Sequence, residues 1–175
     1  ISGRVRDAKD RPVAGLVVSA LRLHGGGPRF PPDRGMATST NDLGDYKLTG
    51  LNPGRYAVLV ETKRSAISPK DWKDDEKLTL PGPAMAEVRT YYPNARSLDV
   101  AVPIQLETGQ ALEGIDLTLT RLETFCVRSR VLDPGAQTMN RIRIHIASEY
   151  YLGAANLADG ELAPGGGFEV CGLPP

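Results

Sequence analysis

The chain has 175 residues, and its 21 basic and 21 acidic side chains give a formal net charge of zero at pH 7. This balance argues against a nucleic-acid or anionic-membrane surface, and no apolar run approaches the ~20 residues that cross a bilayer. The 19 glycines, 14 prolines and 41% hydrophobic residues indicate a turn-rich β protein with enough apolar side chains for a core.

The first 61 residues predict strands that are separated by turns. Residues 1–6 alternate between two faces, as in a half-buried strand. The other expected strands share an apolar or alternating pattern and cover residues 16–23, 36–40, 45–49 and 55–61. Turns rich in Asn, Asp, Gly and Pro at residues 41–44 and 50–54 bound the strand around which this part of the chain is organised.

Residues 62–86 are polar and charged, and they predict a long insertion with one helical turn around residues 71–77. Further strands are expected at residues 88–92, 103–106 and 111–121. Together these patterns predict one domain over residues 1–121, a β-sandwich of about seven strands.

After residue 121 the pattern restarts, which is the signature of an internal repeat. Residues 127–133 are similar to the start of the chain, residues 141–146 alternate in the slot of the second strand, and residues 167–175 match residues 45–53. The sequence therefore predicts a second, incomplete β-sandwich repeat over residues 122–175, without a counterpart of residues 55–58.

Three explanations of the incomplete repeat stay open. The chain is an excerpt of a longer series of modules, or these strands extend the first sandwich, or a partner molecule adds the missing strand. An excerpt or a mature form also fits the lack of an initiator Met and of a signal peptide.

Four motifs carry a family resemblance. They are ISGRVRD, the Gly-Asp-Tyr-x-Leu-x-Gly-Leu-x-Pro-Gly-x-Tyr run from Gly44, TYYPNA and GIDLTL. Together they resemble the carboxypeptidase regulatory-like modules, which are transthyretin-like (prealbumin-like), Ig-like sandwiches of secreted and cell-surface bacterial proteins. The resemblance covers most of residues 1–121 and implies an extracellular or cell-surface β-sandwich. It implies no peptidase activity, since these motifs are turn and core residues.

The ionisable residues do not form a catalytic or metal-binding pattern. His24 and His145 lack the paired spacing of zinc ligands. Asn41, Asp42 and Asp45 cluster at a turn without the acidic ladder of a calcium loop. We therefore expect no enzyme activity, no metal and no cofactor.

The two cysteines lie beside apolar residues of expected strands. Phe125 and Val127 take the inward parity and Cys126 the other one, and Cys171 likewise points away from its apolar neighbours. In an oxidising compartment we expect an intrachain disulfide between Cys126 and Cys171, with free thiols and interchain pairing as the alternatives.

Five aromatic residues are candidates for contacts with a ligand or a subunit. They are Trp72, Tyr91, Tyr92, Tyr150 and Tyr151. Tyr91 and Tyr92 belong to a motif of the resembled family, which favours packing. Trp72, in the charged insertion, could cap the sandwich, grip a ligand or join a subunit contact.

The favoured function is a non-enzymatic structural or interaction module of a secreted or surface protein, self-assembling by edge-strand or head-to-tail contacts. Expected partners are other modules of the same chain or further copies of it, with no nucleic acid and no membrane insertion. The first alternative is an accessory carbohydrate-binding module with a glycan as partner. The second is a regulatory module attached to a peptidase.

Overall fold

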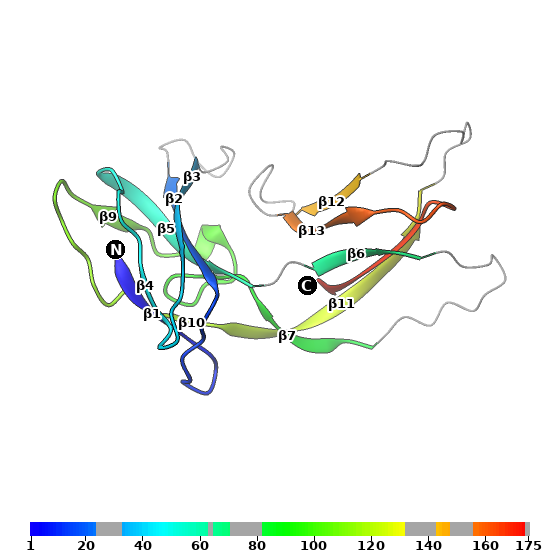
Figure 1. The fold of residues 1–175 in the computed structure, drawn as a ribbon, viewed down its shortest axis with the longest axis horizontal. Coiled ribbons are helices and arrows are strands. Elements are labelled where there is room, and N and C mark those ends of the chain that lie inside the picture. The colour runs from blue at the N-terminus through cyan, green and yellow to red at the C-terminus, as the bar shows by residue number, and fades with distance from the viewer. Residues whose placement is uncertain (24–32, 63–64, 71–81, 132–142, 148–155, 174–175) are drawn as a thin grey trace. The chain divides into compact units, whose positions relative to one another are not determined.

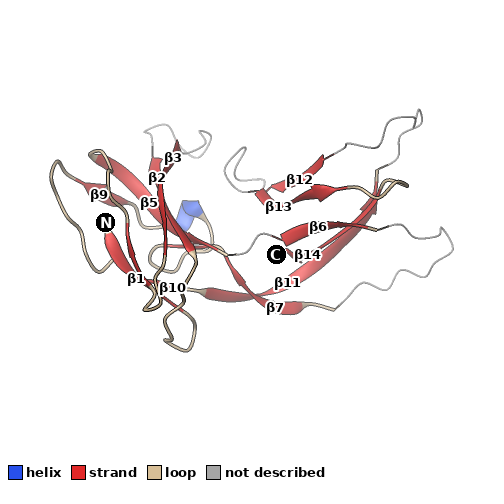
Figure 2. Cartoon of the chain, viewed as in Figure 1, coloured by secondary structure: helices blue, strands red, loops and turns tan. Residues whose placement is uncertain are grey.

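The computed structural model describes residues 1–23, 33–62, 65–70, 82–131, 143–147 and 156–173, without the side chains of residues 33–35, 65–66, 143–147 and 156–159. The described part consists of strands and one 3-10 helix, η1 (Leu98–Val100) (Figure 2). It contains no helix with the length and apolarity that a membrane crossing requires. The predicted all-β, sandwich-like class is confirmed.

The strands follow one another along the chain. They are β1 (Ser2–Arg6), β2 (Val17–Leu23), β3 (Asp33–Ser39), β4 (Asp45–Lys47), β5 (Gly54–Glu61), β6 (Ser65–Pro69), β7 (Ala84–Val88), β8 (Thr90–Tyr91), β9 (Ile104–Leu106), β10 (Leu117–Thr118), β11 (Thr120–Arg130), β12 (Arg143–Ala147), β13 (Asn156–Glu161) and β14 (Gly167–Leu173).

The chain divides into two compact units. The first contains Ile1–Thr62 and Glu87–Arg121, and the second contains Lys63–Ala86 and Leu122–Pro175. The sequence predicted one domain over residues 1–121. In the structure, residues 63–86 belong instead to the second compact unit. Strand β11 continues across the expected boundary after residue 121.

In the first unit, two sheets form the layers of a sandwich-like arrangement (Figure 1). One sheet has the strand order β10-β1-β4, in which β1 is parallel to β10 and antiparallel to β4. The other has the order β3-β2-β5-β8, and β9 pairs with the first part of β5. Strand β2 is antiparallel to both β3 and β5.

Strand β5 contributes to two cores of the first unit, because its residues 56–60 are all buried. Tyr56, Val58 and Val60 belong to the main core, which also contains residues of β1, β2, β4, β9 and β10. Ala57 and Leu59 belong to a smaller cluster with Tyr91. The continuous apolar run is therefore that of a strand covered on both faces.

The turn before β4 depends on Asn41 and Gly44. The Asn41 side-chain oxygen accepts hydrogen bonds from the backbone N–H groups of Leu43 and Asp45, at 2.9 and 2.8 Å. Gly44 has φ 74°, and a Cβ there would lie 2.5 Å from the Val5 carbonyl oxygen. Both the left-handed conformation and the close approach of β1 require glycine.

Residues 111–116 were expected to be strand, but the regular ladder begins only at Leu117. Gly114 has φ 73°, which interrupts an extended chain. Two hydrogen bonds still join this segment to β1, from Ser2 N–H to the Leu112 carbonyl (2.8 Å) and from Ile115 N–H to the Ser2 carbonyl (3.0 Å). The predicted strand over residues 111–121 is therefore regular only from Leu117 onward.

The second unit is built on one sheet with the order β12-β13-β6-β14-β11-β7. Its core is a small cluster around Ile67, Phe168, Val170 and Leu173. Strand β6 lies between β13, to which it is parallel, and β14, to which it is antiparallel.

The expectation that residues 62–86 form only an insertion was wrong for β6 and β7. Ser65–Pro69 is short, and no strand close to it in the sequence pairs with it. Its hydrogen-bonding partners are β13 and β14, which lie far along the chain. Ile67 is buried there. The expected helical turn at residues 71–77 lies outside the described residues.

We predict that Ile67→Ala destabilises the second unit by about 2–4 kcal/mol, because it leaves a cavity in a small core. Ile104→Ala is the matched control, since Ile104 is equally buried but belongs to the main core of the first unit. Amide hydrogen exchange should show faster opening of β14 in the first variant and of β5 in the second. Faster opening of β5 in Ile67→Ala, with β14 unchanged, would contradict the assignment of β6.

Candidate interaction surface on the second unit

The pair β11–β14 repeats the pair β1–β4 with the same register. Gly3 lies opposite Tyr46 in the first pair, and Ser129 lies opposite Phe168 in the second. The next position in each pair aligns in the same way, because Arg4 faces Asp45 where Arg130 faces Gly167. The internal repeat seen in the sequence therefore extends to backbone pairing.

The turns before β4 and β14 also share their hydrogen bonds. Gly44 N–H donates to the Asn41 carbonyl (2.9 Å), and Gly166 N–H donates to the Ala163 carbonyl (2.8 Å). The two turn glycines have φ 74° and 79°. Each glycine carbonyl accepts a bond from the matching strand, from Val5 N–H at 2.8 Å and from Val131 N–H at 3.0 Å.

The two repeats differ in what covers the start of the first strand. Ile1 exchanges backbone hydrogen bonds with Leu48, and in the second repeat Val127 lies opposite Val170. Leu48 and Val170 are both buried, but Ile1 is 9% exposed and Val127 is 43% exposed. Phe125, two residues before Val127, is 42% exposed.

The exposure of Phe125 and Val127 corrects the expectation that both point into a core. In the first unit, Ile1 belongs to a core that also contains β5 and β9 side chains, such as Tyr56 and Ile104. Among the described residues of the second unit, no strand takes the place of β5 or β9 in its sheet. The apolar parity is that of a covered strand face, but none of the described strands of the second unit covers it. We call Phe125 and Val127 the open patch.

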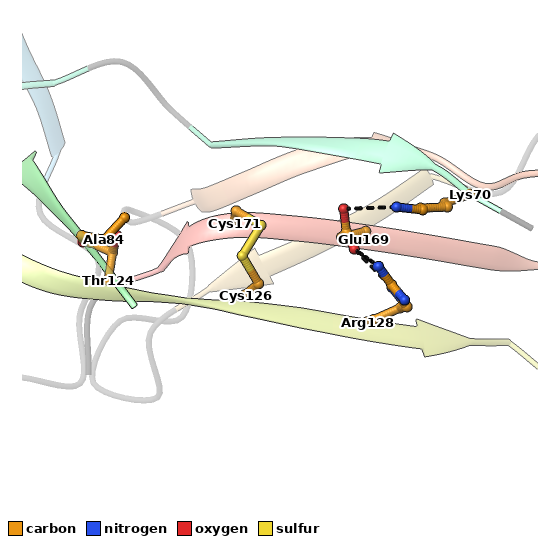
Figure 3. The surroundings of a disulfide bond; sticks show 7 residues. All are labelled: Lys70, Ala84, Thr124, Cys126, Arg128, Glu169 and Cys171. Atoms are coloured by element: carbon orange, nitrogen blue, oxygen red, sulfur yellow. Dashed lines mark hydrogen bonds and ion pairs between the residues drawn. A yellow bond between two sulfur atoms is a disulfide. The ribbon is translucent and has the colours of Figure 1, made fainter. Parts of the chain in front are cut away.

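A disulfide joins Cys126 of β11 to Cys171 of β14, 45 residues apart in the chain (Figure 3). Phe125 pairs with Leu173 and Val127 with Val170, so Cys126 faces two residues, Cys171 and Gly172. The register shifts here, as at a β-bulge, and Gly172 has the left-handed φ of 80°. Of the three pairing states left open by the sequence, the structure has the intrachain bond.

Beside the disulfide, Glu169 holds two cations (Figure 3). Arg128 Nε donates to Glu169 Oε2 at 2.8 Å and Arg128 Nη2 pairs with the same oxygen, while Lys70 Nζ lies 3.5 Å from Oε1. The Arg128 side chain is only 7% exposed. The hydrogen bond from Arg128 holds the pKa of Glu169 below its ordinary value.

The Arg128–Glu169–Lys70 group was not singled out in the sequence, although a signal was present. Arg128 lies two residues after Cys126, and Glu169 two residues before Cys171, so on paired strands they share the face of the disulfide. Because Lys70 directly follows β6, this group connects three segments of the sheet. Its role is to hold the strands together.

The candidate aromatic platform is not found among the described residues. Tyr91 is 5% exposed and packs in the small cluster of the first unit, and the half-buried Tyr92 packs against the main core. Trp72, Tyr150 and Tyr151 lie outside the described residues. Of the two candidates that the structure describes, Tyr91 and Tyr92, neither belongs to an exposed aromatic surface.

The turn with Asn41, Asp42 and Asp45 is a structural turn. The Asn41 side chain accepts two backbone hydrogen bonds, and Asp45 Oδ1 accepts one from Arg4 Nε at 2.7 Å. Within the described ranges, no three His, Cys, Asp or Glu residues gather as metal ligands do. His24 and the side chain of His145 lie outside the described part.

The fold and the open patch define an all-β module of sandwich type, in whose second unit no described strand covers the open patch. A family model described as the carboxypeptidase regulatory-like domain matches residues 1–70. The resemblance expected from the sequence motifs is thus confirmed over the segment from β1 to the end of β6. No curated protein and no solved structure matched the chain.

We predict that replacing both Cys126 and Cys171 by Ser lowers the stability of the second unit by about 2–4 kcal/mol. The reason is that the bond restricts the unfolded chain over a long loop. Denaturant unfolding of the oxidised chain and of the double variant measures this difference. Reductant should lower the stability of the natural chain and leave the double variant unchanged. A similar response of both proteins to reductant would contradict a stabilising role of the bond.

The low pKa of Glu169 predicts the direction of an acid effect. Ionised Glu169 contributes its full stabilisation above the pKa of an unfolded Glu, about 4.3, and loses it as the pH falls through the lower pKa of the folded state. Glu169→Gln should therefore be less stable at pH 7 and show a weaker loss of stability on acidification, measured by denaturant unfolding of the second unit.

A matched control for this acid effect lies in the first unit. Asp7 accepts hydrogen bonds from the backbone N–H and the side chain of Arg11, and these lower its pKa to about 2. Asp7→Asn should change the acid dependence of the first unit alone. Equal acid profiles of the second unit in the natural chain and in Glu169→Gln would contradict the role of the ion pair.

Proposed function

We propose that the chain is a non-enzymatic structural and interaction module of a secreted or cell-surface protein, which associates through the open side of its second unit. The observation that carries this proposal is the open patch. Val127 is 43% exposed at the position where the first repeat buries Ile1 to 9%. A sheet face that is apolar in one repeat and uncovered in the other is a natural contact surface.

Three further points support the assignment. A disulfide within a small unit suits an oxidising, extracellular compartment, and the resembled family occurs in secreted and surface proteins. Several described acidic groups are engaged in structural pairs, including Glu169 with Arg128, Asp45 with Arg4 and Asp7 with Arg11. These pairs support a structural role over catalysis.

We predict that the chain self-associates and that Val127→Asp weakens this association about tenfold or more. Burying a valine contributes about 1.5–3 kcal/mol, and 1.4 kcal/mol corresponds to a factor of ten in affinity. Static light scattering over a concentration series measures the mass against the 18.8 kDa of one chain.

Val102→Asp is the matched control for that experiment. Val102 is 50% exposed in the first unit, so the change adds the same charge at a similar exposure without touching the open patch. The control should associate like the natural chain. A mass of one chain at every concentration, or equal weakening by both variants, would overturn the proposal of assembly through the open side.

A further inference from the structure

We propose that the Cys126–Cys171 disulfide is a site of thiol–disulfide exchange with an external dithiol. Its reduction releases the end of β14, Cys171–Leu173, from β11 and weakens association through the open patch. This inference rests on the proposed function and names a regulator of the same surface. The bond, the strand end and the patch all belong to one strand pair, β11–β14.

The disulfide lies at the point of the ladder that carries the open patch. Cys126 stands between the two residues of the patch, Phe125 and Val127. The register of β11–β14 shifts here, and beyond the shift a single pair, Phe125 with Leu173, reaches the end of β14. On the other side the ladder continues through four pairs without a shift. The bond therefore fixes the part of the ladder that has the fewest backbone pairs.

The first repeat shows that the same positions fold without a covalent link. The matching registers place Cys171–Leu173 at the positions of Thr49–Leu51. These residues of the first unit lie beyond the end of β4 and form no strand. Even so, Gly50 has φ 71° where Gly172 has 80°, and Leu51 packs against the main core. We therefore expect release of the strand end to leave the rest of β14 paired.

The bond is open to attack from the side of β14. Cys171 is exposed, whereas Cys126 is half-buried, so an external thiolate meets Cys171 more readily. Arg128, Lys70 and Glu169 share the face of the disulfide (Figure 3), and two cations with one anion give one net positive charge. This charge favours the approach of one thiolate and the departure of another.

The exchange balances with the dithiol as the reductant. A thiolate of the dithiol attacks the Cys171 sulfur, the bond to Cys126 breaks, and Cys126 leaves as a thiolate that takes up a proton. The second thiolate of the reagent then attacks the reagent's own sulfur in the mixed disulfide and releases Cys171, which is protonated in turn. The protein gains two thiols, and the dithiol is oxidised to its disulfide.

Reduction affects the patch because Phe125 loses a fixed neighbour. In the oxidised chain, the bond holds Phe125 opposite Leu173 and next to Val127, so the surface is ordered before it binds. In the reduced chain, the strand end has to be ordered when the patch meets a second copy. We expect this cost, about that of ordering one side chain, to weaken association about two- to tenfold.

The first experiment treats the full chain with dithiothreitol under native conditions and counts the thiols by alkylation and mass spectrometry. The rate of reduction should rise in proportion to the dithiothreitol concentration, because the folded chain reacts. A rate that levels off at the rate of unfolding would overturn exchange in the folded chain. Brief treatment with the monothiol glutathione should leave a mixed disulfide on Cys171, and one on Cys126 would overturn the order of attack.

A pair of variants tests the neighbouring charge. Lys70→Gln removes one positive charge from the face of the disulfide and should slow the reduction about twofold at low salt. Lys47→Gln, at an exposed position of the first unit, is the matched control and should leave the rate unchanged. Equal rates in both variants would overturn the role of this charge.

Backbone chemical shifts measured by NMR locate the change. On reduction, the shifts of Cys171–Leu173 should move toward unstructured values, while those of Gly167–Val170 remain those of a strand. Loss of the strand shifts throughout β14 would overturn local release. The chain with Cys126→Ser and Cys171→Ser is the control, since it should associate like the reduced natural chain and not respond to dithiothreitol.

Light scattering of the oxidised and reduced chains separates this inference from the proposed function. Equal association of the two forms would overturn the link between the bond and the open patch but leave self-assembly intact. Reduction with local release in a chain that has the mass of one copy in both forms would support the exchange site and overturn self-assembly. Weaker association of the reduced chain, with local release, would support both.

Discussion

The pairing of β5 with β2 is the interaction on which closure of this fold depends. Because residues 56–60 of β5 are buried on both faces, this strand contributes to the main core and to the smaller cluster beside it. The main core joins side chains of the β10-β1-β4 sheet to those of β2, β5 and β9. Without β5, the apolar face of β1 and β4 would lack most of its covering layer.

The described strands of the second unit include no counterpart of β5. Its β11–β14 pair keeps the register and the turn of β1–β4, although no described strand covers its apolar face. Its buried cluster is small, and the disulfide and the Arg128–Glu169–Lys70 group lie on the same pair of strands. A covalent link and a largely buried ion pair suit a unit that buries little apolar surface.

Much of this could be predicted because it depends on neighbours in the chain. The Asn41–Gly44 turn follows from side-chain hydrogen bonding and from the left-handed conformation of glycine, and the same turn at Gly166 follows from the repeat. The face shared by Cys126 and Arg128 follows from the period of two in a strand. The segment matched by the family model, residues 1–70, contains the Asn41–Gly44 turn.

The sequence by itself thus determined the β class, the repeat, the turns and the parity of most strands, since these are set by side chains a few residues apart. Only the tertiary structure decided that β6 enters the sheet of the second unit and that Val127 stays exposed where Ile1 is buried. Both outcomes depend on which distant strands supply hydrogen bonds and a covering layer. Periodicity identifies the apolar face of a strand, but burial of that face requires a partner elsewhere in the fold.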